Sequence, residues 1–171
     1  NFTNIKKGPI FFFGNEFFDA IPIKQFSLKK NLLFEKHYFF NKQKNIVEIY
    51  KKANLKDTLL IKNYKSLKNL KFLEFPKLGF DELNKIIEKI SRLSGGILLL
   101  DYGYLKSNNK NTLQSVMRHK KNNILENLGK ADVTSLVNFD LLNEHFVKNN
   151  LKVQKIVSQS FFLQKMGIVE R

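Results

Sequence analysis

Hydrophobic residues form two short continuous runs in this chain, with an amphipathic stripe between them. The runs are residues 10–13 and residues 97–100, and glycines flank the first run and precede the second. Apolar runs of this length between turn residues are typical of strands buried on both faces, as in a parallel sheet. From Phe80 to Leu93 the apolar residues recur at helical spacing, which predicts an amphipathic helix.

Charged residues and glycines mark the ends of this predicted helix. Asp81 and Glu82 lie at its start, where negative charge favours the helix dipole, and Arg92 lies near its end. Gly95 and Gly96 follow, and we expect them to supply the left-handed residue that ends a helix. The second part of a βαβ unit consists of a helix, the residue that ends it and a following apolar strand, as this segment does. The sequence therefore predicts an α/β fold with a parallel sheet.

A hairpin and several smaller elements complete the predicted fold. Residues 32–40 and 46–50 are rich in β-branched and aromatic residues and flank a polar turn, which predicts a β-hairpin over 32–50 with one wet face. Residues 105–135 are polar and lysine-rich, and we interpret them as an excursion from the sheet. The remaining expectations are a strand at 59–61, a helix over 139–147 with Asn138 as its N-cap, and closing strands at 152–158 and 161–163.

Length and composition indicate one globular domain. The chain has 171 residues, of which 43% are hydrophobic, and no apolar run approaches the roughly 18–20 residues that span a bilayer. It has no cysteine, which excludes disulfides, thiolate metal sites and thiol nucleophiles. No secretory signal is visible, so we expect a cytoplasmic protein. The first residue is Asn1 rather than methionine, which leads us to expect a fragment.

The net charge of +15 permits two interpretations. One is a nucleic-acid or anionic membrane partner. The other is a solvated surface produced by an A/T-rich genome, since lysine, asparagine, isoleucine and phenylalanine have A/T-rich codons. Only three of the 30 basic residues are arginine, the residue that specific nucleic-acid readers enrich, and the lysines are dispersed. The sequence favours the solvated surface over a nucleic-acid partner.

Polar residues follow directly after both predicted strands. Asn15, Glu16 and Asp19 come after the first strand, and Asp101 and Tyr102 come after the second. Ligands of open α/β sheets bind beyond the carboxyl ends of the strands, so these residues occupy the expected place of a site. Carboxylates beside aromatic rings suit a cationic ligand such as a guanidinium, an ammonium or a sulfonium. Asp19 taken alone is more typical of a turn or a helix cap than of a site, and the sequence leaves the role of Tyr102 open between core and site.

The three histidines give no support to a metal site. His37, His119 and His145 lie far apart, and no two of them have metal-ligand spacing. His145 falls on the apolar face of a predicted helix, where a packed histidine is the commoner finding. The basic run at 118–121 is more typical of a solvated loop than of an acidic-surface contact.

Six segments in order resemble the MidA-type family, which comprises mitochondrial complex I assembly methyltransferases and their bacterial homologues. The first segment, Asn-Glu-Phe-Phe-Asp-Ala-Ile-Pro at 15–22, is similar to a family signature. The others are 100–104, 112–119 with its Thr-Leu-Gln start, 129–134 with Gly-Lys-Ala-Asp-Val-Thr, 137–139, and 159–168. Asn138 departs from the family pattern, which has an aspartate there.

The resemblance implies a Rossmann-like class I methyltransferase fold, S-adenosylmethionine (SAM) as cofactor, and proteins as substrates. In the mitochondrial members the acceptor is arginine, so a complex I subunit is the implied partner and the mitochondrial matrix the implied location in a eukaryote. The glycine-rich SAM loop of such enzymes lies upstream of their fourth strand. We therefore expect residues 1–171 to be the carboxyl-terminal part of one methyltransferase domain, without the SAM-loop half and inactive alone. The 32–50 hairpin would be an insertion in this sheet.

The resemblance also implies roles for individual residues. Glu16, Asp19 and Asn15 are the expected catalytic residues, and Asn15 is also expected to contact the cofactor. The expected substrate-binding residues are Asp101, Tyr102, His119, Asp132 and Thr134. Two alternatives remain: a non-catalytic scaffold or assembly factor, and a basic RNA-binding module.

Overall fold

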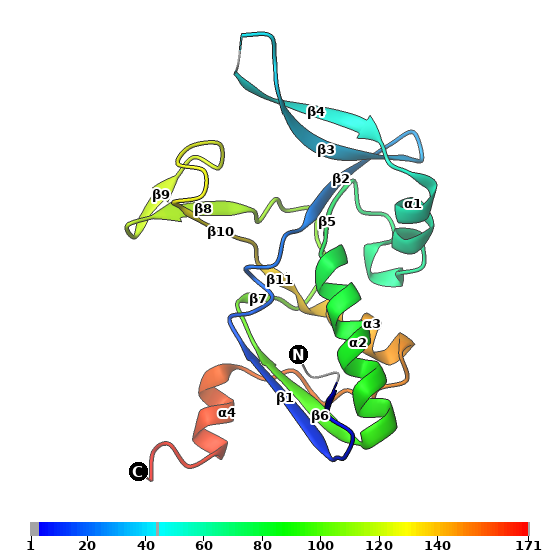
Figure 1. The fold of residues 1–171 in the computed structure, drawn as a ribbon, viewed down its shortest axis with the longest axis vertical. Coiled ribbons are helices and arrows are strands. Elements are labelled where there is room, and N and C mark those ends of the chain that lie inside the picture. The colour runs from blue at the N-terminus through cyan, green and yellow to red at the C-terminus, as the bar shows by residue number, and fades with distance from the viewer. Residues whose placement is uncertain (1–3, 44, 171) are drawn as a thin grey trace.

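The computed structural model describes residues 4–43 and 45–170, and it has the predicted α/β architecture (Figure 1). The helices are α1 (Leu55–Lys62), η2 (Lys65–Leu67, a 3₁₀ turn), α2 (Lys77–Leu93), α3 (Phe139–Lys148) and α4 (Gln159–Lys165). The longer strands are β1 (Ile10–Asn15), β2 (Lys24–Lys29), β3 (Leu32–Phe40), β4 (Ile46–Lys52), β5 (Phe72–Phe75) and β6 (Gly95–Leu100). The shorter strands are β7 (Gly103–Tyr104), β8 (Gln114–Met117), β9 (Lys120–Asn122), β10 (Asp132–Thr134) and β11 (Val137–Asn138).

The two apolar runs form a parallel pair, as predicted. Strand β1 pairs with β6 in a register that places Ile10 opposite Gly95 and Asn15 opposite Leu100. Gly95 is required by this close approach, because a Cβ atom there would lie 1.7 Å from the carbonyl oxygen of Ile10. Two residues after α2 have positive φ: Ser94, with φ 62°, and Gly95, with φ 133°, so the conformation expected of the glycines begins one residue before them.

The expectation that the first strand is buried on both faces is wrong for the described residues. Along β1 exposure alternates, and the side chains of Phe11 and Phe13 are 79% and 67% exposed. The physical reason is that this two-stranded sheet packs against a helix on one face, while the face that carries Phe11 and Phe13 is left exposed in the described part of the chain. The other face packs against α2, whose buried residues include Phe80, Leu83 and Ile87.

The predicted hairpin is present as β3 and β4. It belongs to a four-stranded antiparallel sheet with the order β4-β3-β2-β5. The hydrophobic pattern does not predict strands β2 and β5. The strand expected at 59–61 is wrong, since these residues lie in α1. Asn54 caps this helix by accepting a hydrogen bond from the backbone N–H of Asp57, and a capped start outweighs a short apolar run.

Asp57 ties three elements of this region together. Its side chain is 2% exposed and accepts hydrogen bonds from Lys24 of β2, at 2.8 Å, and from Lys77 of α2. Burial opposes the charge of this carboxylate, but the two lysines and Asn54 outweigh burial and lower its pKa to about 2.

The closing strands expected at 152–158 and 161–163 are also wrong. Residues 152–158 have no regular structure, and residues 161–163 lie in α4, whose first turn is capped by the hydroxyl of Ser158. The excursion at 105–135 contains a small antiparallel sheet of its own, β10-β8-β9, which is separate from the β1–β6 pair. Helix α2 begins at Lys77, four residues before Asp81, where the sequence placed its start.

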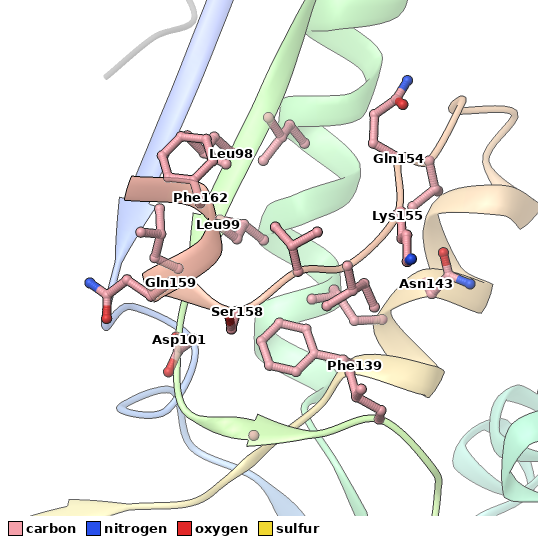
Figure 2. Close-up of a pocket in the computed structure, with 18 of the residues that line it drawn as sticks. Leu98, Leu99, Asp101, Phe139, Asn143, Gln154, Lys155, Ser158, Gln159 and Phe162 are labelled. Atoms are coloured by element: carbon pink, nitrogen blue, oxygen red, sulfur yellow. The ribbon is translucent and has the colours of Figure 1, made fainter. Parts of the chain in front are cut away.

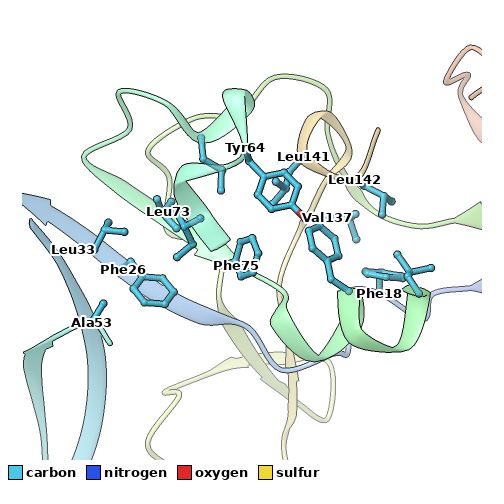
Figure 3. Packing of buried hydrophobic residues seen from close by; sticks show 14 of the residues in the cluster. Phe18, Phe26, Leu33, Ala53, Tyr64, Leu73, Phe75, Val137, Leu141 and Leu142 are labelled. Carbon is cyan, nitrogen blue, oxygen red and sulfur yellow. The ribbon is translucent and has the colours of Figure 1, made fainter. Parts of the chain in front are cut away.

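The main core lies between the antiparallel sheet, α2 and α3 (Figure 3). Phe26, Phe75 and Leu141 are fully buried there. Helix α3 begins after Asn138, whose side chain accepts from the backbone N–H of Leu141, so the predicted N-cap is confirmed. His145 is a packed core histidine, as the sequence indicated: its ring stacks on Phe80 with centroids 4.0 Å apart. In the described part of the chain, no helix has the length and apolarity needed to cross a membrane.

Candidate functional site

The carboxyl ends of β1 and β6 bring the predicted acidic residues together. The β1–β6 ladder continues one step past β1, because the backbone N–H of Glu16 donates to the carbonyl oxygen of Leu100 at 2.9 Å. Glu16 then adopts a left-handed conformation with φ 48°, and its side chain is exposed. A glutamate in this backbone region is uncommon and costs conformational energy, and such residues cluster at functional sites.

Asp101 holds the turn that carries Glu16 and Asp19. One of its carboxylate oxygens accepts from the backbone N–H groups of Phe18, at 2.8 Å, and Asp19, at 3.3 Å. The other oxygen accepts from the N–H of Tyr102 at 2.8 Å. The bonds from Phe18 and Asp19 connect the end of β6 to the turn after β1, and the bond from Tyr102 orients the carboxylate. Asp101 therefore anchors the site, in addition to any contact with a ligand.

Tyr102 lies beside Glu16 at the mouth of the site. Its hydroxyl donates to Glu16 Oε1 at 3.3 Å, and its side chain is exposed. The negative charge of Glu16 and the hydrogen bond to it raise the pKa of the Tyr102 hydroxyl. Tyr102 is therefore not a core residue, and its role as a substrate-binding residue stays a prediction.

Asp19 is the partly buried carboxyl of the group. Burial raises its pKa, and the negative charges of Asp101 and Glu16 raise it further, while backbone N–H groups partly oppose the shift. The carbonyl oxygen of Asp19 accepts from the N–H of Ser135, so the turn is also tied to the segment after β10. Three carboxyl groups with one raised pKa form an acidic cluster that a cation would neutralise.

An apolar cavity of about 590 Å³ opens beside this cluster. Figure 2 shows Asp101 at one end of the cavity, Phe139 and Asn143 from α3 along one side, and Phe162 from α4. The cavity wall also includes Asn15, Glu16 and Tyr102. A mostly apolar cavity with a few convergent polar groups at one end is typical of a small-molecule site.

The structure separates the other three predicted site residues from the acidic cluster. His119 occupies the exposed β8–β9 turn, with φ 61°, and Figure 1 shows this hairpin projecting away from the ends of β1 and β6. Asp132 is exposed on β10. Thr134 lies nearer, because it precedes Ser135, and its hydroxyl accepts from Gln114 at 3.2 Å.

The Thr-Leu-Gln motif has a structural contact that the sequence did not reveal. The Thr112 hydroxyl donates to Glu74 of β5 and accepts from the N–H of Leu136. It therefore fastens the excursion to the antiparallel sheet and to the strand that precedes α3.

Sequence reasoning missed the residues of 153–159 that line the cavity. Ser158 and Gln159 contribute polar atoms at the acidic end, and Val157 contributes apolar surface. The sequence predicts a strand over 152–158, and Gln159 lies just after it, so the pattern does not indicate a cavity wall. The available signal was Ser158, three residues before Phe161, which is an N-cap pattern.

The chain is an α/β protein with an acidic cluster at the carboxyl ends of a parallel strand pair and an apolar cavity beside it. This arrangement is typical of a site for a cationic or nucleoside-like ligand. The chain belongs to the family described as "Putative S-adenosyl-L-methionine-dependent methyltransferase", whose model matches residues 1–157. This membership confirms the resemblance on which the sequence interpretation rests.

Two relatives match nearly the whole chain. One is the protein arginine methyltransferase NDUFAF7 homolog, mitochondrial, of Caenorhabditis elegans, which is 31% identical over 98% of this chain and 40% of its own length. The other is the protein arginine methyltransferase NDUFAF7, mitochondrial, of Danio rerio, which is 26% identical over 98% of this chain and 39% of its own length. The chain thus spans about two fifths of these relatives.

Two solved structures from Burkholderia thailandensis share the fold. One, a "likely methyl transferase" bound to S-adenosyl-homocysteine, has a TM-score of 0.75 at 18% identity and covers 96% of this chain and 44% of its own. The other, an uncharacterized protein in its native form, has a TM-score of 0.77 at 18% identity over 96% of this chain and 45% of its own. The predicted methyltransferase fold is therefore confirmed.

Proposed function

We propose that the complete protein transfers a methyl group from SAM to an arginine side chain of a protein, and that this chain supplies the acceptor end of the active site. The observation that carries the proposal is the acidic cluster of Glu16, Asp19 and Asp101 at the carboxyl ends of β1 and β6. Membership of the methyltransferase family and the names of the two relatives support the reaction and the acceptor.

Each acidic residue has a distinct part in this proposal. Glu16, with its exposed carboxylate, pairs with the guanidinium and turns one nitrogen toward the methyl donor. Arginine is protonated at neutral pH and is a poor nucleophile, so the proton of the reacting nitrogen must leave on methylation. Asp19, whose pKa is raised, is suited to accept this proton. Asn15 orients the acceptor by hydrogen bonds, and Asp101 keeps the turn in place.

The residues of this chain fit part of the cofactor. When bound, SAM supplies an electrophilic methyl group on a sulfonium, and carboxylates beside Tyr102 suit that cation. The apolar cavity beside them is large enough for a nucleoside-sized group. The described residues contain no glycine-rich SAM loop. We therefore propose that the main cofactor-binding loop lies in the part of the protein outside this chain.

The uncovered face of β1 supports the same division. A parallel sheet is ordinarily covered on both faces, yet Phe11 and Phe13 are exposed here. Because this chain spans about two fifths of its relatives, we propose that the remainder of the protein covers this face.

The substrate and the location follow from the relatives and the resemblance. Both relatives are named as mitochondrial protein arginine methyltransferases. We propose a protein substrate, with a respiratory complex I subunit as the first candidate. The corresponding location is the mitochondrial matrix in a eukaryote and the cytoplasm in a bacterium.

The proposal is tested with the complete protein and tritiated SAM. Incubation with an extract of cells that lack the protein should label protein, and hydrolysis of the labelled protein should release methylated arginine. Label in another amino acid would contradict the arginine acceptor. Binding of SAM without any transfer to protein would favour the scaffold alternative. Salt-dependent retention of RNA, without any transfer of label to protein, would favour the RNA-binding alternative.

A further inference from the structure

The outer half of the β3–β4 hairpin is apolar on both faces. We call this half the hairpin tip, and it comprises Tyr38, Phe39, Phe40, Ile46 and Val47. Phe40 pairs with Ile46 on one face of the ribbon, and Phe39 pairs with Val47 on the other. Phe40, Phe39 and Tyr38 are 67%, 44% and 39% exposed. At the base of the hairpin, by contrast, Leu33 and Ala53 are buried in the core.

The hairpin tip is ordered by its own hydrogen bonds. The ladder between β3 and β4 extends to its last pair, Phe40 and Ile46. Beyond it, Asn41 closes the turn twice: its N–H donates to the carbonyl oxygen of Asn45, and its side chain accepts from the N–H of Asn45, both at 2.9 Å. A two-stranded ribbon is only marginally stable alone, so large aromatic rings exposed on both of its faces make the hairpin tip a candidate docking surface.

The charge around the hairpin tip indicates the chemistry of that molecule. Residues 29–52 contain seven lysines and two glutamates. Both glutamates are engaged, because Glu48 pairs with Lys36 at 2.7 Å and Glu35 pairs with Lys24 at 2.9 Å. Lys42, Lys51 and Lys52 are exposed. Charge complementarity favours a partner with an acidic rim, and repulsion between two basic hairpins disfavours a second copy of this chain.

The position of the hairpin tip indicates the size of the partner. Figure 1 shows β3 and β4 reaching beyond the body at one end of the long axis, while the carboxyl ends of β1 and β6 lie near its middle. A ligand that occupies both places must extend across the antiparallel sheet. A folded protein can do this, whereas a single amino acid or a short peptide held at the acidic cluster cannot.

From these observations we infer that the hairpin tip docks into an apolar groove with an acidic rim on the folded protein substrate, at a distance from the residue that is methylated. This inference rests on the proposed function, because it takes the methylated protein as the partner. Phe39 and Phe40 are the anchors, and the surrounding lysines orient the partner before contact.

The test compares the complete protein with its Phe39→Thr/Phe40→Thr variant. Threonine keeps the β-propensity of both positions and removes the rings. Leu59→Thr is the matched control, since Leu59 is 55% exposed on α1, outside the hairpin. The initial rate of methyl transfer from tritiated SAM is measured against the concentration of extract from cells that lack the protein. Circular dichroism and SAM binding are measured for each variant.

We expect the extract concentration for half-maximal rate to rise about tenfold in the double variant, with the maximal rate and SAM binding unchanged. The control should behave like the wild type. An unchanged concentration dependence in the folded double variant would overturn the inference, even though the proposed function stood. No labelling by the wild type would instead be a failure of the proposed function.

Three further measurements ask whether another partner covers the hairpin tip. They are sedimentation with vesicles of phosphatidylglycerol and phosphatidylcholine in equal parts, retention of single-stranded RNA, and the molar mass by light scattering. Loss of vesicle binding, RNA binding or self-association in the double variant, without a change in methyl transfer, would overturn the inference by assigning the tip to that partner.

Discussion

Individual carboxylates divide the work of the candidate site. Asp101 uses both of its oxygens on backbone N–H groups, whereas the carboxylate of Glu16 is exposed and receives the Tyr102 hydroxyl. The first group therefore shapes the turn, and the second is available to a ligand. This distinction predicts different outcomes for substitutions at the two positions.

Asp101→Asn should destabilise the protein. The amide oxygen of asparagine can still accept from some of the three backbone N–H groups. Its N–H₂ group then faces the remaining N–H donors and cannot bond to them. The loss of a hydrogen bond to a charged group costs about 2 kcal/mol. Denaturant unfolding should show this loss. Asp132→Asn, at an exposed position on β10, should change stability by less than about 0.5 kcal/mol. Equal stability of the two variants would show that Asp101 does not anchor the turn.

At the residue level, the sequence predicted that the polar residues after the two strands lie at one edge, but not that His119, Asp132 and Thr134 lie apart from them or that Asp101 holds the turn. Asn15, Glu16 and Asp101 meet because parallel strands end at the same edge, which the apolar runs already indicated. The anchoring role of Asp101 depends on bonds to Phe18 and Asp19, more than 80 positions away in sequence. Side-chain hydrogen bonds of this range have no sequence pattern, so they could not be predicted.

His145 packs helix α3 against its neighbours, Phe80 of α2 and Tyr64. The ring is 3% exposed, stacks on Phe80 of α2, and shares a hydrogen bond of 2.8 Å between its Nδ1 and the Tyr64 hydroxyl. Burial lowers the pKa of His145 to about 4, because the charged ring would lose its hydration.

The lowered pKa predicts acid sensitivity of this packing. The unfolded chain binds a proton at His145 below its ordinary pKa of about 6.5, while the folded chain stays neutral until about pH 4. The stability that this neutral histidine contributes is full above pH 6.5 and is lost as the pH falls toward 4. Between pH 7.5 and pH 5 the loss is about 2 kcal/mol.

Urea unfolding at these two pH values checks this expectation. In His145→Phe, the difference in stability between the two pH values should be smaller than in the wild type by about this amount. An identical difference in both proteins would show that His145 does not govern the acid response.

Elements were predicted best where one pattern dominated. The stripe on α2, the β3–β4 hairpin and the Asn138 cap each had a strong local signal, and each is present. The strand predictions for residues 59–61 and 152–158 were wrong. A short apolar run fits a helix, a strand or an irregular segment equally well. In both cases a capping residue, Asn54 or Ser158, begins the adjacent helix. Local capping chemistry is the better guide to such runs.

The whole molecule has its acidic cluster, its open β1 face and its hairpin tip in three separate places. Figure 1 shows the β1–β6 pair at one end of the molecule and the β3–β4 ribbon at the other. In the proposed function the acidic cluster receives the arginine and the remainder of the protein covers Phe11 and Phe13. The hairpin tip then contacts the protein that carries the arginine. The sequence could not predict the open face, because burial of a strand depends on neighbours that lie outside the strand.

The central claim is that Glu16 positions the methyl acceptor. Its most direct test is the Glu16→Gln variant of the complete protein, assayed for methyl transfer to protein and, by calorimetric titration, for SAM binding. Glu126→Gln, at an exposed position in the excursion, is the matched control. We predict that Glu16→Gln lowers methyl transfer at least about 100-fold while stability and SAM binding match the control. Methyl transfer by Glu16→Gln at the rate of the control would contradict the account.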